Sequence, residues 1–119
     1  MNLAIVGSRT FNDYELLKKE TDIFIKENST IITCVVSGGA KGADSLGERY
    51  AREYNIPTKI FYPNWDLYGK KAGYLRNIDI VKNADLVIAF WDGVSTGTKS
   101  SIKLAKEQNK ILKVIYANK

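Results

Sequence analysis

The segment Val35-Val36-Ser37-Gly38-Gly39-Ala40-Lys41-Gly42-Ala43-Asp44 decides the fold. Its first two residues are the end of a β-branched run over residues 31–36, and such a run is typical of a buried parallel strand. After the glycines, apolar residues recur at positions 43, 46, 47, 50, 51 and 54. This spacing is that of one face of an amphipathic helix. The segment therefore predicts a strand, a glycine turn and a helix in direct succession.

The glycine turn has two interpretations. Glycines let the backbone turn sharply and let a ligand approach the main chain. The helix that follows offers unpaired N–H groups at its N-terminus, which suit a phosphate. However, the spacing is that of neither a P-loop nor a G-x-G-x-x-G fingerprint. Taken alone, the turn is equally consistent with a phosphate cradle and with a tight structural connection.

The composition is that of an ordinary globular protein. The chain has 119 residues, of which 45% are hydrophobic and 26% are charged, and this predicts one domain over residues 1–119. No apolar run is long enough to span a bilayer, and the chain begins as a strand rather than as a basic leader. Together with a single cysteine, Cys34, which we expect to be a reduced core residue, these features favour a cytoplasmic protein.

The net charge and the absence of histidine limit the chemistry that the chain can perform. The net charge of +5 indicates either a solvated lysine-rich surface or attraction to phosphate-bearing ligands. The chain has no histidine, which removes the usual acid–base group near neutral pH and the commonest transition-metal ligand. No cluster of carboxylates suggests a magnesium site either. We therefore expect no metal and no cofactor.

Strands alternate with helices along the whole chain. We expect strands at 3–6, 31–36, 59–62, 86–91 and 111–116. We expect helices from a capping box of Asn12 and Glu15 to residue 27, then at 43–54, 72–82 and 98–108, with a polar and aromatic loop at 64–71. The strands are continuous apolar runs rather than alternating ones. This pattern predicts a Rossmann-like α/β domain with a five-stranded, mostly parallel sheet and helices on both faces.

Three of the expected strand-to-helix loops combine glycine with serine or threonine. They follow the strands at 3–6, 31–36 and 86–91. In a doubly wound sheet these loops lie together at the carboxyl ends of the strands, where ligands bind. Their convergence favours a phosphate or nucleotide site over three unrelated turns.

Four segments carry a family pattern. They are Gly7-Ser8-Arg9, the glycine turn at 37–44, Tyr-Gly-Lys-Lys-Ala-Gly-Tyr-Leu-Arg-Asn at 68–77, and Ala-Asp-Leu-Val-Ile-Ala-Phe-Trp-Asp-Gly-Val-Ser-Thr-Gly-Thr at 84–98. In this order they resemble the SLOG superfamily of Rossmann-like domains, specifically its small stand-alone bacterial and phage group. The resemblance implies a nucleotide-shaped pocket.

Members of that superfamily differ in what they do with such a pocket. Lonely-guy enzymes hydrolyse the N-glycosidic bond of nucleoside 5′-monophosphates. The DNA-processing protein of natural transformation binds single-stranded DNA. Sensor domains of antiphage systems bind NAD-derived or ADP-ribose-like signals. The resemblance therefore leaves three classes of function open.

The candidate ligand-binding residues come from the same segments. Arg9 could contact a phosphate or could be a surface residue, and Lys41 could likewise be simply solvated. Asp44 suits a ribose hydroxyl and the dipole of its own helix equally well. Aromatic residues such as Trp65, Tyr68 and Tyr74 offer a surface for base stacking or a cover for the sheet edge. The expected set is Gly7, Ser8, Arg9, Ser37, Gly38, Gly39, Lys41, Asp44, Trp65, Arg76, Asn77, Trp91, Ser95, Gly97 and Thr98.

Catalysis is where the chain departs from the enzymes it resembles. In lonely-guy enzymes, the motif matched by Arg76-Asn77 helps to hold and activate the nucleotide. Those enzymes also place a catalytic glutamate after the pair matched by Gly97-Thr98, where this chain has Lys99-Ser100-Ser101. Hydrolysis at an anomeric carbon needs a carboxylate. We therefore expect no catalytic residue here and binding without turnover.

The expected function is recognition or sequestration of a nucleotide or an ADP-ribose-like signal. One alternative is an N-glycosidic hydrolase in which Asp44 or Asp92 replaces the glutamate. Another is single-stranded nucleic-acid binding, which we expect to be weak and sensitive to salt. The partners expected are thus a small nucleotide and a second copy of the chain, since relatives are often dimers or larger, and no membrane.

Overall fold

Five parallel strands form the central layer in the computed structural model, which describes residues 1–117. The central strand is β1 (Asn2–Gly7), and the sheet order is β3-β2-β1-β4-β5. Its neighbours are β2 (Cys34–Ser37) and β4 (Leu86–Trp91), and the edge strands are β3 (Thr58–Ile60) and β5 (Ile111–Tyr116). All four pairings are parallel. This sheet confirms the predicted Rossmann-like α/β fold.

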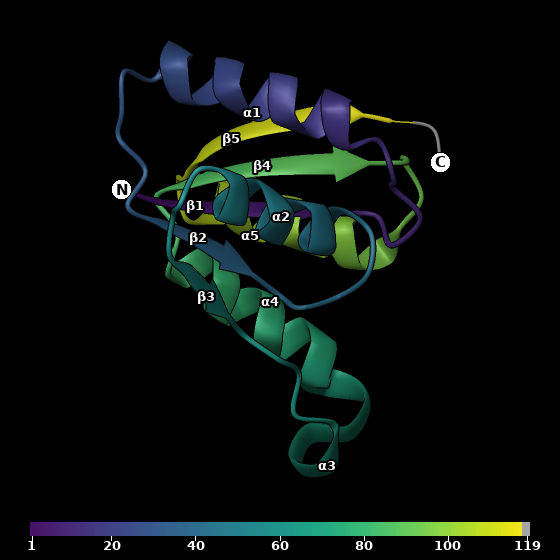
Figure 1. The fold of residues 1–119 in the computed structure, drawn as a ribbon. Helices are drawn as coiled ribbons and strands as arrows, with labels where there is room; N and C mark the ends of the chain where they lie inside the picture. The colour runs from purple at the N-terminus through teal and green to yellow at the C-terminus, as the bar shows by residue number, and fades with distance from the viewer. Residues whose placement is uncertain (118–119) are drawn as a thin grey trace.

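Helices cover both faces of the sheet (Figure 1). On one face, α1 (Tyr14–Glu27) and α2 (Ala43–Glu53) pack against each other and against the strands. On the other face lie α4 (Ala72–Lys82) and α5 (Thr96–Glu107). Within residues 1–117, no helix combines the length and the hydropathy required to cross a bilayer.

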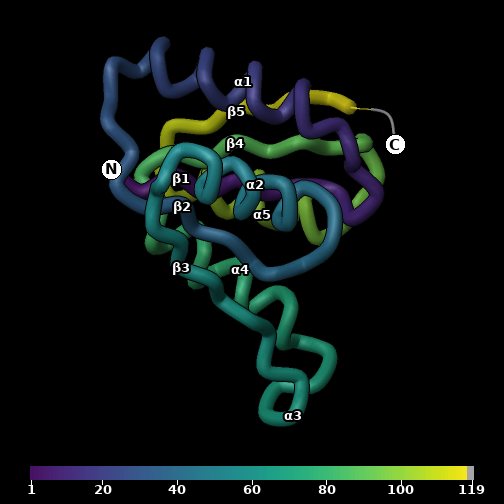
Figure 2. The backbone as a smooth tube through the Cα atoms, in the orientation of Figure 1, coloured from purple at the N-terminus to yellow at the C-terminus, as the bar shows by residue number. Residues whose placement is uncertain are grey.

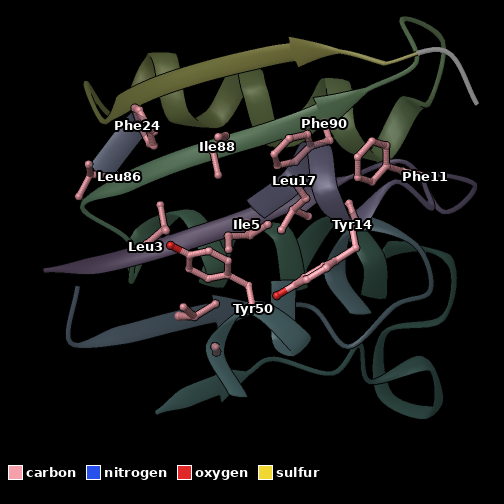
Figure 3. Packing of buried hydrophobic residues seen from close by; sticks show 13 residues of the cluster. Leu3, Ile5, Phe11, Tyr14, Leu17, Phe24, Tyr50, Leu86, Ile88 and Phe90 are labelled. Atoms are coloured by element: carbon pink, nitrogen blue, oxygen red, sulfur yellow. The ribbon is translucent and has the colours of Figure 1, made fainter. Parts of the chain in front are cut away.

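Side chains of β1 alternate between two separate hydrophobic cores, one on each face of the sheet. Leu3 and Ile5 pack with residues of α1 and α2, among them Leu17, as Figure 3 shows. Ala4 and Val6 point the other way and pack with residues of α4 and α5. Because both faces of the central strands are covered, these strands are apolar along most of their length, as the sequence indicated.

Two strand boundaries differ from the prediction. The second strand begins at Cys34 rather than at residue 31, and Ile31 is 81% exposed. Pairing with β1 sets this start, because Asn2 lies opposite Cys34. Cys34 is consequently half-buried at the beginning of the strand rather than a core residue. The third strand covers Thr58–Ile60 instead of 59–62.

Helix starts also differ. The predicted capping box of Asn12 and Glu15 is wrong, because Asp13 is the N-cap of α1 and its carboxylate accepts a hydrogen bond from the amide of Leu16 at 3.1 Å. Helix α5 begins two residues earlier than expected, at Thr96. The other helix boundaries agree to within one residue.

The expected loop at 64–71 contains two short helical turns. These are α3 (Trp65–Tyr68) and the 3-10 turn η1 (Gly69–Lys71). The side chain of Asn64 starts α3 by accepting a hydrogen bond from the amide of Leu67 at 3.1 Å. Figure 1 shows α3 projecting beyond the layers formed by the sheet and the longer helices.

Candidate functional site

A cleft of about 580 Å³ opens at the carboxyl end of the sheet. Figure 2 shows the connections that follow β1, β2 and β4 at this one end of the molecule. Residues of α4 form a further wall. Nine of the predicted ligand-binding residues line the cleft: Gly7, Ser8, Arg9, Asp44, Arg76, Asn77, Ser95, Gly97 and Thr98.

Ser8 holds three connections together beneath the cleft. Its amide donates to the carbonyl of Phe90 at 2.9 Å, and its carbonyl accepts from the amide of Ala43 at 3.2 Å. Its hydroxyl accepts from the amide of Asp92 and from the hydroxyl of Ser95, both at 3.1 Å. The side chain is almost completely buried. Ser8 therefore fixes the relative positions of the connections that follow β1, β2 and β4.

Gly42 lets two of these connections approach closely. Its φ is +77°, in the region that favours glycine. A Cβ atom at this position would lie 2.3 Å from the carbonyl oxygen of Ser8 and 2.5 Å from the backbone of Arg9. Only glycine can therefore occupy this position without moving the first loop. This contact explains why the sequence has its third glycine here.

Asp92 shapes the approach to α5. Its carboxylate accepts hydrogen bonds from the amides of Val94 and Ser95 at 2.9 and 2.8 Å, and from the hydroxyl of Ser95 at 2.9 Å. The hydrogen bonds from Ser95 and Val94 hold the pKa of this carboxyl at about 2. Asp92 thus remains ionised near neutral pH, and its oxygens are occupied by the loop.

The N-terminus of α5 faces the cleft. Ser95 is the N-cap residue but makes no side-chain capping hydrogen bond. Within residues 1–117, the amides of Thr96, Gly97 and Thr98 have no hydrogen-bond acceptor, as expected for the first turn of a helix. A Cβ atom on Gly97 would meet nothing within 4 Å. The helix therefore presents unpaired amides and open space at the same place.

Arg76 and Asp44 lie together at the second connection. A Cβ atom on Gly38 would lie 2.6 Å from Nη1 of Arg76 and 2.8 Å from Oδ2 of Asp44. The guanidinium of Arg76 donates to the carbonyl of Gly38 through Nη1, and to Oδ1 of Asn77 through Nε at 3.1 Å. Asp44 accepts from the amide of Ala40 at 3.3 Å. Both side chains are therefore held in place before any ligand enters.

Burial perturbs the pKa of both groups. It raises the pKa of Asp44 to about 6, although the hydrogen bond from Ala40 and the charge of Arg76 favour the ionised form. Burial also lowers the pKa of Arg76. The negative charge of Asp44 raises this pKa, and the nearby positive charge of Arg9 lowers it further. The cleft thus combines two arginines that repel each other with a carboxyl group that titrates near neutral pH.

The other predicted residues lie outside the cleft lining. Ser37 is buried and donates to Glu48 at 2.7 Å. Gly38 packs against Arg76, and Gly39 lies beneath the ring of Tyr62, where a Cβ atom would be 2.5 Å from the ring.

Lys41 and the two tryptophans complete this group. Lys41 is exposed at the turn. Trp65 belongs to the projecting helix α3. Trp91 donates its indole N–H to the carbonyl of Ser95 at 3.0 Å and packs against Tyr116. Trp91 therefore holds the loop that precedes α5 and does not line the cleft.

Several lining residues are absent from the predicted set. They include Thr10, Thr96, Ser100 and Ser101. Thr96 lines the cleft because α5 starts earlier than the sequence suggested. Ser100 and Ser101 had a signal in the sequence, since they follow Gly97-Thr98 where the resembling enzymes place their glutamate. Within residues 1–117, no group of three or more Asp, Glu, Cys or His side chains could hold a metal ion.

Comparisons with known proteins give a consistent family assignment. The model of the YspA, cpYpsA-related SLOG family matches residues 1–68. The Gene 61 protein of Mycobacterium phage D29 is 39% identical in an alignment of length 115, and the match covers 88% of this chain and 88% of that protein.

Two solved structures share the fold. DNA processing protein A (DprA) from Streptococcus pneumoniae superposes with a TM-score of 0.72 and 21% identity, over 98% of this chain and 50% of that chain. The X-ray structure of TM1055 gives a TM-score of 0.65 and 18% identity, over 93% of this chain and 71% of that one. This chain therefore spans half the length of DprA.

Proposed function

Because the chain belongs to the YspA, cpYpsA-related SLOG family, we propose that its cleft binds a nucleotide or an ADP-ribose-like molecule through phosphate and releases it unchanged. One observation carries the proposal: the unpaired amides of Thr96, Gly97 and Thr98 open into the cleft that Arg9 and Arg76 also line. The N-terminus of a helix is a ready anion site, because its amides and the helix dipole both favour negative charge.

The two arginines add charge to these amides. In addition to burial, the positive charge of Arg9 disfavours the charged form of Arg76 and so lowers its pKa. A phosphate between them would replace this repulsion with two attractive interactions. Arginine also presents donors in a fork that matches phosphate oxygens. The cleft is therefore more complementary to a phosphorylated ligand than to a neutral nucleoside.

The remaining walls suit the rest of a nucleotide. A volume of about 580 Å³ lies within the usual range of small-molecule pockets. Tyr74 lines the cleft with a half-exposed ring that can stack on a base. Asp44 can accept a hydrogen bond from a ribose hydroxyl when ionised. DprA is named for DNA processing, which supports a ligand of nucleotide chemistry in this fold.

Release of the ligand unchanged is proposed from the residues beyond the Gly97-Thr98 pair. Ser100 and Ser101 line the cleft, and their hydroxyl groups can hydrogen-bond to a ligand. A neutral hydroxyl neither stabilises an oxocarbenium-like state nor activates water as a carboxylate does. Asp92 is committed to its own loop through three hydrogen bonds. The cleft thus holds a nucleotide better than it cleaves one.

N-glycosidic hydrolysis is the second candidate, and Asp44 is the observation that favours it. A carboxyl group with a pKa near 6 in a cleft has the property of a general acid or base. The same perturbation also arises when a carboxyl group is buried only to position an arginine. Asp44 fits the second description well, since it lies beside Arg76 under Gly38.

One experiment separates the two candidates. The protein, at a concentration matching the ligand, is incubated with AMP or ADP-ribose, denatured, and the released molecules are identified by mass spectrometry. Intact ligand in a stoichiometric amount is the result we expect. Free base or ribose phosphate that accumulates over many turnovers, and is abolished by Asp44→Asn, would establish the hydrolase instead. The Asp92→Asn variant is tested in parallel, because Asp92 is the other carboxylate that could replace the glutamate, and loss of turnover in that variant would assign the role to Asp92 instead.

A further inference from the structure

Exposed aromatic side chains gather on one projecting segment, residues 62–74, which we call the aromatic arm. It contains α3, η1 and the start of α4. Tyr62, Trp65, Tyr68 and Tyr74 are 70%, 52%, 49% and 53% exposed, and Leu67 between them is 67% exposed. Large apolar side chains elsewhere on the described surface do not gather in one segment in this way. An exposed aromatic patch of this kind marks a binding surface.

The backbone of the aromatic arm is held in place by local contacts. Asn64 caps the start of α3, and Gly69, with φ at +56°, is the C-cap residue that ends it. The ring of Trp65 lies against Gly73, where a Cβ atom would be 3.6 Å from the Cη2 atom of the ring. Tyr62 packs over Gly39 at the other end of the arm. The rings are therefore offered on an ordered support rather than on a loose loop.

The charges of the aromatic arm are mainly positive. Lys70 and Lys71 are exposed on η1, against the single acidic residue Asp66. Lys59 on the neighbouring edge strand β3 adds a third positive charge, with its Nζ atom 5.2 Å from the ring centre of Phe61. Exposed aromatic side chains and exposed lysines thus occur together in one short segment and in the strand before it. A polyanion that carries flat rings would satisfy both.

We propose that the aromatic arm binds single-stranded nucleic acid, with bases stacked on Trp65 and Tyr68 and the backbone phosphates near Lys70 and Lys71. Stacking on exposed aromatic rings together with a positively charged track is the usual basis of sequence-independent single-strand binding. Charge complementarity favours this partner over a second copy of the chain. A symmetric contact through the arm would bring two pairs of lysines together, with only one aspartate from each copy to offset them.

This inference goes beyond the proposed function, because it concerns a surface outside the phosphate cradle. The arm and the cleft share only Gly73 and Tyr74, which line the cleft at the base of the arm. An oligothymidine without terminal phosphates probes the arm. Its failure to bind would leave the test of the cleft with AMP or ADP-ribose untouched, so the two proposals can fail separately.

The test is a titration of the whole protein with fluorescein-labelled oligothymidine, followed by anisotropy. Trp65→Ala is expected to weaken binding roughly five- to hundredfold, since each base–aromatic stack typically contributes about 1–3 kcal/mol. Trp65→Phe keeps a ring, so it should retain most of the affinity while losing the quenching of tryptophan fluorescence by unlabelled oligothymidine. Tyr116→Ala is the matched control, an exposed aromatic residue on the opposite edge strand.

Salt dependence provides a second readout. Replacing both Lys70 and Lys71 with glutamine should reduce the slope of log K against log salt by about 1.4, at roughly 0.7 per phosphate contact on a single strand. The control is the double replacement of Lys103 and Lys106 on α5, which should leave the slope unchanged. Equal affinities for Trp65→Ala and Tyr116→Ala would overturn the proposal. Concentration-dependent sedimentation that Trp65→Ala abolishes, without oligothymidine binding, would overturn it in favour of self-association.

Discussion

Replacing Asp44 with asparagine should change how stability depends on pH. Burial raises the pKa of this carboxyl from 3.8 to about 6 in the folded protein. The folded state therefore holds a proton on Asp44 between these two values, whereas the unfolded state has released it. The stability that this proton contributes is fully present below pH 3.8 and is lost as the pH rises through about 6. A difference of about two pKa units corresponds to about 3 kcal/mol.

The assay is urea denaturation of both proteins at a series of pH values from about 4 to 7. The free energy of unfolding of Asp44→Asn minus that of the original chain should increase by up to about 3 kcal/mol as the pH rises across this range, because only the original chain loses stability through this titration. The attraction between the ionised carboxylate and Arg76 is already part of this pKa, so only differences in the packing and hydrogen bonding of asparagine add a constant offset. Asp92→Asn is the control, because the pKa of Asp92 is about 2 and its titration falls below the range. Parallel curves for Asp44→Asn and the original chain would refute the reasoning.

Three further substitutions test the cleft and its support. Gly97→Ala should stay folded, with stability unchanged or higher by up to about 1 kcal/mol in urea denaturation, because the new methyl group meets open space. Calorimetry should nevertheless show weaker AMP binding, and an unchanged affinity would count against phosphate at this turn. Gly42→Ala should lose more than about 1 kcal/mol in the same denaturation assay, because φ is +77° and the Cβ atom would press on Ser8. Arg76→Ala should weaken AMP binding roughly tenfold to a hundredfold, given about 1.5–3 kcal/mol for hydrogen bonds to charged groups. Adenosine should lose much less affinity by calorimetry; an equal loss for both ligands would mean that Arg76 does not contact phosphate.

The fold was predictable because its signals are local and repeated. Continuous apolar runs such as Leu86–Trp91 occur where both faces of a strand are covered, and that strand has the predicted bounds. The boundaries that differed depend on distant partners. Residue 31 belongs to an apolar run, yet no residue of β1 lies opposite it, so the strand starts at Cys34.

The cleft was predictable in outline from the topology. Parallel strands carry the segments that follow them to one end of the sheet, which brought Arg9, Asp44 and Gly97 to the same cleft. Topology does not say which side of a turn faces the cleft. Ser37 and Trp91 lie in the segments that form the cleft, but their side chains do not line it. The side chain of Ser37 is hydrogen-bonded to Glu48, and that of Trp91 to the carbonyl of Ser95.

The α3 turn was hidden for a different reason. Its four residues are too few to show a helical period, and its start depends on one hydrogen bond from Leu67 to the side chain of Asn64. The aromatic composition of this segment was visible in the sequence. Its projection away from the sheet was not visible in the sequence, because a local sequence pattern does not indicate which side chains stay exposed to solvent in the folded protein.

The most direct test of the phosphate cradle is a nuclear magnetic resonance titration of the ¹⁵N-labelled chain with inorganic phosphate and then with ADP-ribose. A chain of 119 residues is small enough for individual amide signals to be followed. The account predicts that the amides of Thr96, Gly97 and Thr98 shift and saturate with both ligands, because phosphate occupies the first turn of α5. Saturable shifts confined to other parts of the chain, with these three amides unmoved, would contradict it.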